Sequence, residues 1–259
     1  MFNAPNLKID SFIASLDEAM QKSRAAQPKR QYLGASMWGD TCDRKLSYMY
    51  HQYPEDEGKG FSSKILRVFD MGHDGEDRMA EYLKVAGYEL LTVDRQGKQF
   101  GFSEANGLLK GHIDGVILSG PVDMPWPMLW ENKALNNKSW NDTLKKGVQA
   151  SKPLYYAQVN IYCAYKELPN GTLFTAQNRD TGEILAEHIP FDARIAQEAS
   201  DRAVRVVRSE TPLDLARCTS DPADLRCKYC AYQSTCWTKP AATTLSIPPT
   251  PPWLQRKTD

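Results

Sequence analysis

The sequence predicts an α/β protein in which a mixed β-sheet is flanked by helices, and three changes in its hydrophobic pattern support this prediction. Residues 62–87 repeat apolar side chains at helical spacing. From Tyr88 to Leu135 the period changes to two, which is typical of strands. Helical and strand patterns then alternate from residue 139 to residue 210. Strands that are preceded and followed by helices indicate a sheet packed against helices.

Each element is expected from its local pattern. Helices are expected at 7–26, 42–50, 62–87, 139–149, 152–168 and 192–210, strands at 88–94, 98–102, 108–118 and 127–135, and a hairpin at 171–191. The first strands are expected to pair as hairpins. Asn141 or Ser139 is the expected cap of the fourth helix. Gly72 and Gly75 within the third helix indicate close approach of the backbone to another element.

Composition excludes several classes of protein. The 259 residues include 32 basic and 32 acidic side chains, so the chain is no histone-like binder and its bulk charge gives no argument for nucleic acid. No apolar run approaches the length of a membrane-spanning helix. The N-terminus lacks the pattern of a secretion signal. We therefore expect a cytoplasmic protein without a membrane partner.

Four regions are expected along the chain. A helical region covers residues 1–61, an α/β core covers 62–210, and a cysteine-rich region covers 211–238. Residues 239–259 are rich in proline and are expected to form a flexible tail.

Charged side chains stand inside two of the expected strands. Asp114 lies in one apolar run, and Glu131 and Lys133 lie two apart in the next. Residues two apart in a strand point the same way, so Asp114 and Glu131 converge if the strands are neighbours. Two carboxylates suit Mg²⁺ or Mn²⁺, and a lysine beside the metal can act on a water or on a phosphate. The pattern indicates metal-assisted phosphodiester hydrolysis. The alternative is a hairpin that carries Glu and Lys on its wet face.

Two helical pairs accompany these strands. His73 and Glu76 are three apart on one face of a helix, where Glu76 could add a metal ligand. The alternative is an exposed acidic helix. Gln158 and Tyr162 are four apart on another helix and could contact nucleic acid or reach the active site. The alternative is an aromatic core stripe with one buried glutamine.

These motifs together resemble the RecB-like branch of the PD-(D/E)XK nuclease superfamily. The order of MGHDGEDRMAEYL, GHIDG, ENK and QVNIY over residues 36–236 is similar to the helix, aspartate, Glu-x-Lys and Gln-x-x-x-Tyr motifs of that family. The resemblance implies a restriction-endonuclease-like core. It also implies that Asp114 and Glu131 bind Mg²⁺ or Mn²⁺ and that Lys133 serves the attacking water.

Further residues carry over from the same resemblance. Glu76 is the expected third carboxylate ligand, because Gly72 and Glu76 match the end of the helix motif, and His73 is the reserve. The resemblance also implies metal coordination by the Asn132 carbonyl and active-site roles for Gln158 and Tyr162. The sequence departs from the family at one point, since His-Ile-Asp stands where a proline usually precedes the aspartate.

Clustered cysteines in a cytosolic chain indicate metal or redox chemistry before disulfides. Cys227, Cys230 and Cys236 need a fourth ligand for a closed tetrahedral site. With the early Cys42, they resemble the iron–sulfur staple of the CRISPR-associated RecB-like exonucleases and of the AddB nuclease domain. The resemblance implies a structural [4Fe–4S] cluster that joins the two ends of the chain in a helical appendage.

Alternatives remain open for the cysteines. Zn²⁺ is the competing occupant of the same four residues. Cys218 could replace Cys42 in either site, since it lies nine residues before Cys227. Cys163 fits a free structural thiol at an apolar helix position.

The resulting hypothesis is a metal-dependent DNA nuclease, specifically an exonuclease that acts on single strands or DNA ends. End resection in recombination or repair, in a phage or another mobile element, is the expected context. DNA is the expected partner, with recombination or replication proteins as further partners and oligomerisation open. The alternatives are an endonuclease or nickase, an RNA-directed nuclease and a non-catalytic DNA-binding adaptor.

Overall fold

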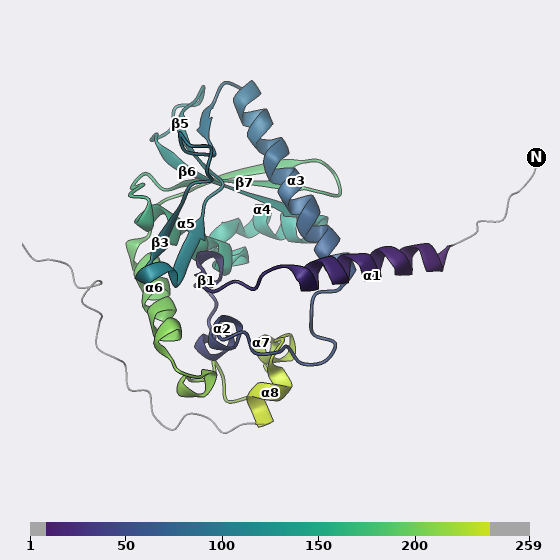
Figure 1. The fold of residues 1–259 in the computed structure, drawn as a ribbon. Coiled ribbons are helices and arrows are strands. Elements are labelled where there is room, and N and C mark those ends of the chain that lie inside the picture. Colours follow the sequence, from purple (N-terminus) through teal and green to yellow (C-terminus); the bar gives the residue numbers. More distant parts are fainter. Residues whose placement is uncertain (1–8, 239–259) are drawn as a thin grey trace, which may run out of the picture.

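The computed structural model describes residues 9–238, which form two β-sheets with helices packed around them (Figure 1). The helices are α1 (Asp10–Ala26), α2 (Asp43–Tyr50), α3 (Ser63–Val85), α4 (Asn137–Ser151), α5 (Pro153–Tyr165), α6 (Ala193–Arg208), α7 (Leu225–Lys228) and α8 (Gln233–Thr238). The strands are β1 (Leu33–Gly34), β2 (Glu89–Leu91), β3 (Gly101–Glu104), β4 (Leu109–His112), β5 (Gly115–Ser119), β6 (Met128–Leu135), β7 (Thr172–Asn178) and β8 (Ile184–Ile189). The expected tail at 239–259 lies outside the described residues.

The larger sheet has five strands in the order β2-β5-β6-β7-β8. Its strands pair antiparallel except for β6 and β7, which run parallel. A second, three-stranded sheet has the order β1-β4-β3, in which β1 runs parallel to β4. Both sheets are therefore mixed, and the expected mixed α/β class is confirmed. Because β5 and β6 are neighbours, the condition for convergence of the two sequence-predicted carboxylates is met.

The expectation of one strand at 108–118 is wrong. The strand β4 ends at His112, and β5 begins at Gly115 in the other sheet. Asp114 lies at this crossing, where its Oδ2 accepts the backbone N–H of Asn132 at 2.8 Å. A Cβ added at Gly115 would lie 2.8 Å from the carbonyl oxygen of Leu91, so glycine allows the close approach to β2. Both halves bury alternate apolar residues, which is why periodicity alone does not reveal the break.

The expected pairing of the first two strands is also wrong. The strand β2 pairs with β5, and β3 pairs with β4, so the two belong to different sheets. The segments after β2 and before β3 are joined by a bridge between Val93 and Gln99 and by a turn in which the Asp94 N–H donates to the Lys98 carbonyl at 2.8 Å. The pattern shows which residues form strands, but partner choice depends on packing of the whole chain.

The other predicted elements match the structure, with one correction at a helix cap. The helices α2, α3, α5 and α6 and the β7–β8 hairpin lie where they were expected. The helix α4 begins earlier than predicted and is capped by Asn136, whose side chain accepts the N–H of Ser139 at 2.8 Å. Neither Asn141 nor Ser139 is therefore the cap. Asn136 directly follows β6, so the helix starts as soon as the strand ends.

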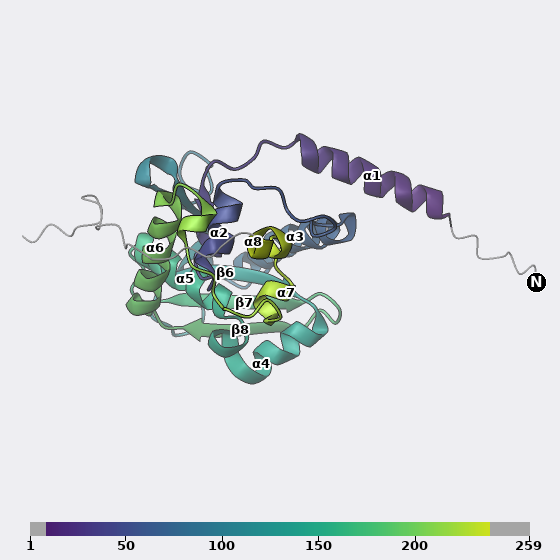
Figure 2. The same cartoon turned by 90° about the horizontal axis from the view of Figure 1, so that it is seen from below.

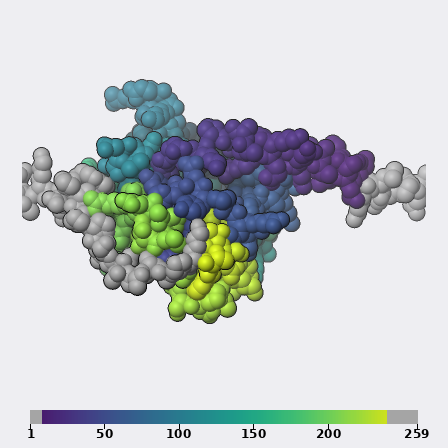
Figure 3. Space-filling view, turned by 60° about the horizontal axis from the view of Figure 1, so that its bottom comes forward, coloured from purple at the N-terminus to yellow at the C-terminus, as the bar shows by residue number. Residues whose placement is uncertain are grey.

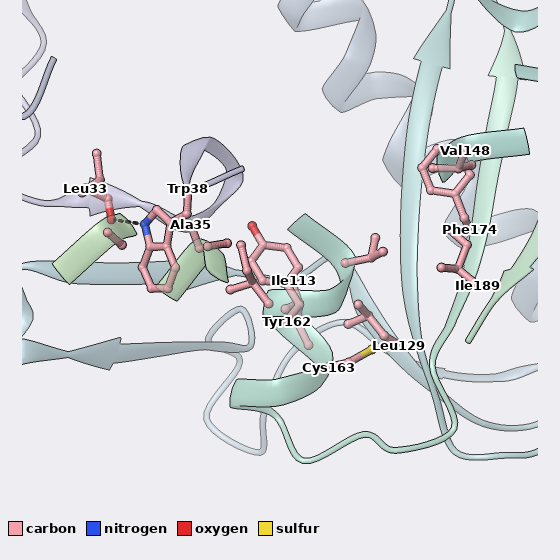
Figure 4. Packing of buried hydrophobic residues seen from close by; sticks show 14 of the residues in the cluster. Leu33, Ala35, Trp38, Ile113, Leu129, Val148, Tyr162, Cys163, Phe174 and Ile189 are labelled. Carbon is pink, nitrogen blue, oxygen red and sulfur yellow. Dashed lines mark hydrogen bonds between the residues drawn. The ribbon is translucent and has the colours of Figure 1, made fainter. Parts of the chain in front are cut away.

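The N-terminal segment is part of the main core (Figure 4). Trp38 is fully buried and donates its indole N–H to the Leu33 carbonyl at 3.3 Å. Tyr162 and Cys163 of α5 and Leu129 of β6 belong to the same buried cluster. The expected boundary at residue 61 stays a prediction.

The helix α1 projects from the body beside α3 (Figures 1 and 2). It has no buried residue. Its contacts are with α3 and with the segment that leads into α3. Arg67 pairs with Asp17 at 2.6 Å, and Gln21 donates to the Phe61 carbonyl at 3.0 Å and to Ser63 Oγ at 3.1 Å.

The C-terminal α7–α8 segment lies against the early part of the chain that contains α2 (Figure 3). Tyr232 stacks on Tyr48 of α2 with ring centroids 5.2 Å apart. Within residues 9–238, no helix is both long and apolar enough to cross a membrane.

Candidate active site and cysteine pocket

The sheet register brings the predicted carboxylates together. Glu131 lies in the middle of β6 and is completely buried, while the Lys133 side chain retains 20% of its exposure. Asp114 immediately precedes β5, and its hydrogen bond to the Asn132 N–H joins it to β6. Asp114 and Glu131 are close enough that the charge on each raises the energy of ionising the other. The sequence-predicted pair is therefore assembled by backbone pairing of two strands.

Side chains from α5 orient Glu131. Its Oε1 accepts hydrogen bonds from Lys133 Nζ and from Gln158 Nε2, the latter at 2.6 Å. Gln158 also donates to the Tyr162 hydroxyl at 3.3 Å. Both α5 residues are buried, so they belong to the core and also reach the carboxylate. The alternative of a core stripe with one buried glutamine therefore describes their burial, and the active-site role of the pair stays a prediction.

Lys133 carries its charge in this environment. Burial opposes that charge, but the carboxylates of Glu131 and Asp114 outweigh burial and raise the pKa of Lys133. The ammonium donates to the Asn132 carbonyl at 3.1 Å and lies 5.4 Å from the ring centroid of Tyr155. These contacts hold the positive charge of Lys133 in a fixed position at the wall of a cleft.

Glu76 of α3 completes a group of three carboxylates. Burial, followed by repulsion from Asp114, raises the pKa of Glu76 to about 7. The same two causes raise the pKa of Glu131 to about 8, and burial raises that of Asp114. His73 is exposed on the neighbouring part of α3 and slightly favours ionisation of Asp114. Without further positive charge, the three carboxylates resist full ionisation at neutral pH.

The donor set fits a hard divalent cation. Carboxylate and carbonyl oxygens are the ligands that Mg²⁺ and Mn²⁺ prefer. Glu131 Oε2 is buried and makes no hydrogen bond with any described residue. Within residues 9–238, no three His, Cys, Asp or Glu side chains are already spaced to hold one ion. The chemistry of the donors fits, and the Lys133 ammonium provides the positive charge beside Glu131 in this arrangement.

A cleft of about 870 Å³ is lined by Glu76, Asn132 and Lys133, whereas Asp114 and Glu131 lie beneath its lining residues. Its walls come from α1, the segment after it, α3, β6 and the start of α5. Gly72 lines the cleft, and a Cβ added there would meet nothing within 4 Å. Gly75 faces β6, where an added Cβ would lie 3.5 Å from that of Ala134. The predicted close approach therefore applies to Gly75, whereas Gly72 borders open space.

The late cysteines meet the early one in a second pocket, of about 340 Å³. Five of the six cysteines line it: Cys42, Cys218, Cys227, Cys230 and Cys236. Cys42 is the N-cap residue of α2, and the others lie on α7, on α8 and in the loops before them. Cys163 lies elsewhere, 3.3 Å from the Thr172 hydroxyl, and burial raises the pKa of its thiol to about 11. Its expected place as a structural thiol is confirmed.

The cysteine pocket has features that fit a metal cluster. Lys45 lines the pocket, where burial opposes its charge but the ion pair with Asp40 at 2.6 Å, with smaller contributions from Cys230 and Cys42, raises its pKa. The buried Tyr48 hydroxyl lines the pocket and has no hydrogen-bond partner among the described residues. Cys218 lies against Cys42, and burial together with Cys42 raises the pKa of Cys218 to about 12. Within residues 9–238, these cysteines do not form a group already spaced to hold one metal ion.

Comparison with known proteins finds solved structures whose folds are similar to that of this chain. No protein-family model matches the sequence, and no curated protein matches it. The crystal structure of SSO0001 is similar at 15% identity with a TM-score of 0.45, covering 90% of this chain and 100% of that one. An alkaline exonuclease from Laribacter hongkongensis (LHK-Exo) is similar at 16% identity with a TM-score of 0.47, covering 73% and 92%. The structure of LHK-Exo in complex with dAMP is similar at 16% identity with a TM-score of 0.47, covering 68% of this chain and 86% of that one.

Sequence reasoning missed residues whose role depends on distant contacts. Thr175 and Trp130 fix the side chain of the sequence-predicted Asn132, because Thr175 donates to its Oδ1 at 2.8 Å and Trp130 donates to Thr175 at 2.9 Å. Arg24 and Arg30 line the same cleft as Glu76 and Lys133. No spacing rule marks Thr175, Arg24 or Arg30, because each lies in an element remote from the motifs, and the role of Trp130 depends on its contact with Thr175. Tyr155 also lines the cleft, and its position three residues before Gln158 on the same helix is the sequence feature that could have indicated it.

Proposed function

We propose that this protein is a metal-dependent deoxyribonuclease, an exonuclease that hydrolyses phosphodiester bonds in single-stranded DNA or at DNA ends. The observation that carries the proposal is the convergence of Glu76, Asp114 and Glu131 beside the charged Lys133 under an open cleft. An ordinary surface hairpin would not bury Glu131 completely. The order of the four motifs supports the same class.

The proposed ligands of Mg²⁺ or Mn²⁺ are Glu76, Asp114, Glu131 and the Asn132 carbonyl, with His73 in reserve. A bound divalent ion polarises phosphate oxygens and lowers the pKa of a bound water. Gln158 holds Glu131 in one rotamer, and Tyr162 holds Gln158.

Lys133 acts through its charge. Its pKa is raised, so it remains an ammonium at neutral pH. It can hydrogen-bond the attacking water oxygen and stabilise the negative charge that develops on the phosphate.

We further propose that Cys42, Cys227, Cys230 and Cys236 hold a structural [4Fe–4S] cluster. The meeting of all four in one pocket with the charged Lys45 supports this assignment. Iron and labile sulfide content, measured on protein purified without oxygen, tests it. Zn²⁺ in place of iron would assign the alternative metal, and Cys218 is then the replacement ligand to test.

The activity is tested with end-labelled linear and closed circular single-stranded DNA in Mn²⁺. Degradation of the linear strand alone, absent in Lys133→Ala, is the expected result and gives the direction of digestion. Cleavage of the circle would assign an endonuclease or nickase. DNA binding without cleavage by the wild-type protein would assign a non-catalytic adaptor, and preference for an RNA strand would redirect the proposal to RNA.

A further inference from the structure

The wall of the cleft that faces the carboxylates belongs to the N-terminal part of the chain. Arg24 and Gln27 at the end of α1 and Arg30 in the following segment line the same cleft as Glu76 and Lys133. The helix α1 is held there from α3 by the Arg67–Asp17 ion pair and the Gln21 hydrogen bonds. The cleft therefore has a basic wall that is anchored to the helix carrying Glu76.

The two arginines of this wall are available to an anion. Both are exposed, and within the described part of the chain neither Arg24 nor Arg30 forms an ion pair. By contrast, Arg67 and Arg78 on α3 are paired with Asp17 and Glu81. Arg24 donates to Gln27 Oε1 at 3.5 Å, and the Arg30 guanidinium lies 5.9 Å from the ring centroid of Tyr32, so the contacts of both are with uncharged groups. Guanidinium groups in this position suit the phosphate groups that follow the cleaved bond.

An exposed aromatic pair stands at the same place. Phe69 lines the cleft and is 41% exposed, and Phe61 is 49% exposed. Their ring centroids are 5.0 Å apart at an interplanar angle of 81°. Large exposed aromatic side chains cost hydrophobic free energy unless a ligand covers them. Bases of an unpaired strand stack on such rings, whereas bases in a duplex are already stacked on one another.

We propose that the α1–α3 mouth, defined as Arg24, Arg30, Phe61 and Phe69, grips a single strand of DNA and leads it to the carboxylates. The arginines contact phosphates and the phenylalanines stack with bases. Cationic side chains interleaved with aromatic ones are the usual composition of a single-strand path. This inference rests on the proposed nuclease function and adds to it the residues that select an unpaired strand.

The test measures binding without catalysis. A fluorescent single-stranded oligonucleotide is titrated with full-length protein in EDTA over a series of salt concentrations. The variants are Arg24→Gln with Arg30→Gln, and Phe69→Ala. The matched control is Lys22→Gln, which removes an exposed cation of α1 that pairs with Glu18 and does not line the cleft. All substituted positions are exposed, and circular dichroism checks that each variant folds.

The double arginine variant is expected to weaken binding at least roughly ten-fold and to reduce the slope of log K against log salt by about 1.4, since each lost phosphate contact on a single strand contributes about 0.7. Phe69→Ala is expected to weaken binding roughly five-fold or more with an unchanged slope, because stacking involves no counterion. Binding of the double arginine variant and of Phe69→Ala that equals the binding of Lys22→Gln would overturn the inference. Equal or tighter binding of a duplex or of RNA would overturn it as well.

The outcome separates this inference from the function on which it rests. If the protein cleaves DNA in Mn²⁺ but the arginine and Phe69 substitutions do not change DNA binding, the proposed α1–α3 mouth is wrong and the proposed nuclease function is retained. Binding that depends on these residues, without cleavage by the wild-type protein, supports the mouth and rejects the nuclease.

Discussion

The carboxylate site and the cysteine pocket bring together residues from distant parts of the chain in two different ways. Asp114 and Glu131 are placed by the backbone register of β5 and β6, and Glu131 is further fixed by hydrogen bonds from its neighbours. The cysteines lie on the N-terminus of α2, on helices of four and six residues, and in loops. Helices this short have little stability of their own.

Because the two sites are built differently, metal binding is expected to have a different effect at each of them. Sheet register exists whether or not a cation binds, so the fold positions the backbone that carries Asp114 and Glu131, and only their side chains have to close around an ion. The cysteine pocket depends on contacts such as the Tyr48–Tyr232 stack and would gain much of its order from thiolate ligation. We therefore expect metal removal to abolish activity at the first site and to lower stability at the second.

The largest expected effect is the loss of activity in Lys133→Ala. Removing the ammonium takes away the charge next to the reacting phosphate, and we expect at least a roughly 100-fold fall in cleavage rate with binding of DNA retained. Lys145→Ala, at an exposed position of α4, is the matched control and should cleave normally. Full activity of Lys133→Ala would remove the site from the reaction.

The second-largest expected effect is a loss of bound iron and of thermal stability when a cysteine of the pocket is replaced. Cys227→Ser is expected to lose the visible absorption of a cluster and most bound iron and to unfold at a lower temperature, since a ligand that binds only the folded state stabilises it. Cys163→Ala is the control, because Cys163 lies outside the pocket. Iron content and melting temperature unchanged in Cys227→Ser would contradict the assignment.

The carboxylate site should respond to pH. The pKa values of Glu76 and Glu131, raised to about 7 and about 8, keep protons on these groups below neutrality. A cation competes with those protons, so Mn²⁺ affinity is expected to rise between pH 6 and pH 8.5, with protons released on binding. Calorimetric titration in two buffers of different ionisation enthalpy measures both quantities. Affinity independent of pH would be the contrary result.

The raised pKa values of Glu76 and Glu131 also determine whether the free energy of unfolding rises or falls with pH. The folded protein binds more protons than the unfolded chain at these carboxyls, so its free energy of unfolding falls as pH rises from the ordinary range of glutamate through about 8. Without divalent cations, the melting temperature should therefore decrease over this range, and Mn²⁺ should restore it. Thermal denaturation at several pH values, in EDTA and in Mn²⁺, checks the direction.

The smallest effect compares one glycine beside each site. An added Cβ at Gly75, behind the carboxylates, meets Ala134 at 3.5 Å, an ordinary contact. Gly75→Ala should stabilise α3 by up to about 1 kcal/mol and raise the melting temperature by about 2–4 °C. An added Cβ at Gly39, in the wall of the cysteine pocket, lies 2.5 Å from the Cβ of Ala157. Gly39→Ala should cost about 1–3 kcal/mol. Equal shifts in the two variants would contradict this contrast.

Much of the local structure follows from sequence pattern alone. Apolar residues at helical spacing placed α2, α3, α5 and α6, and alternation placed the strand residues. The spacing of Glu131 and Lys133 also put both side chains on one face of a strand, because that geometry is a property of every strand. These predictions hold because they depend on residues near one another in the chain.

Tertiary structure alone decided the rest. The break at Asp114 sends β4 and β5 into different sheets although every second residue from Leu109 to Ile117 is buried without interruption. The meeting of Cys42 with Cys218 and Cys236, and the position of Arg24 and Arg30 opposite Lys133, bring together residues far apart in the chain. Local pattern determines which face of an element is buried, whereas the partner of that face is chosen by packing of the whole chain, and in this protein both pockets lie between such partners.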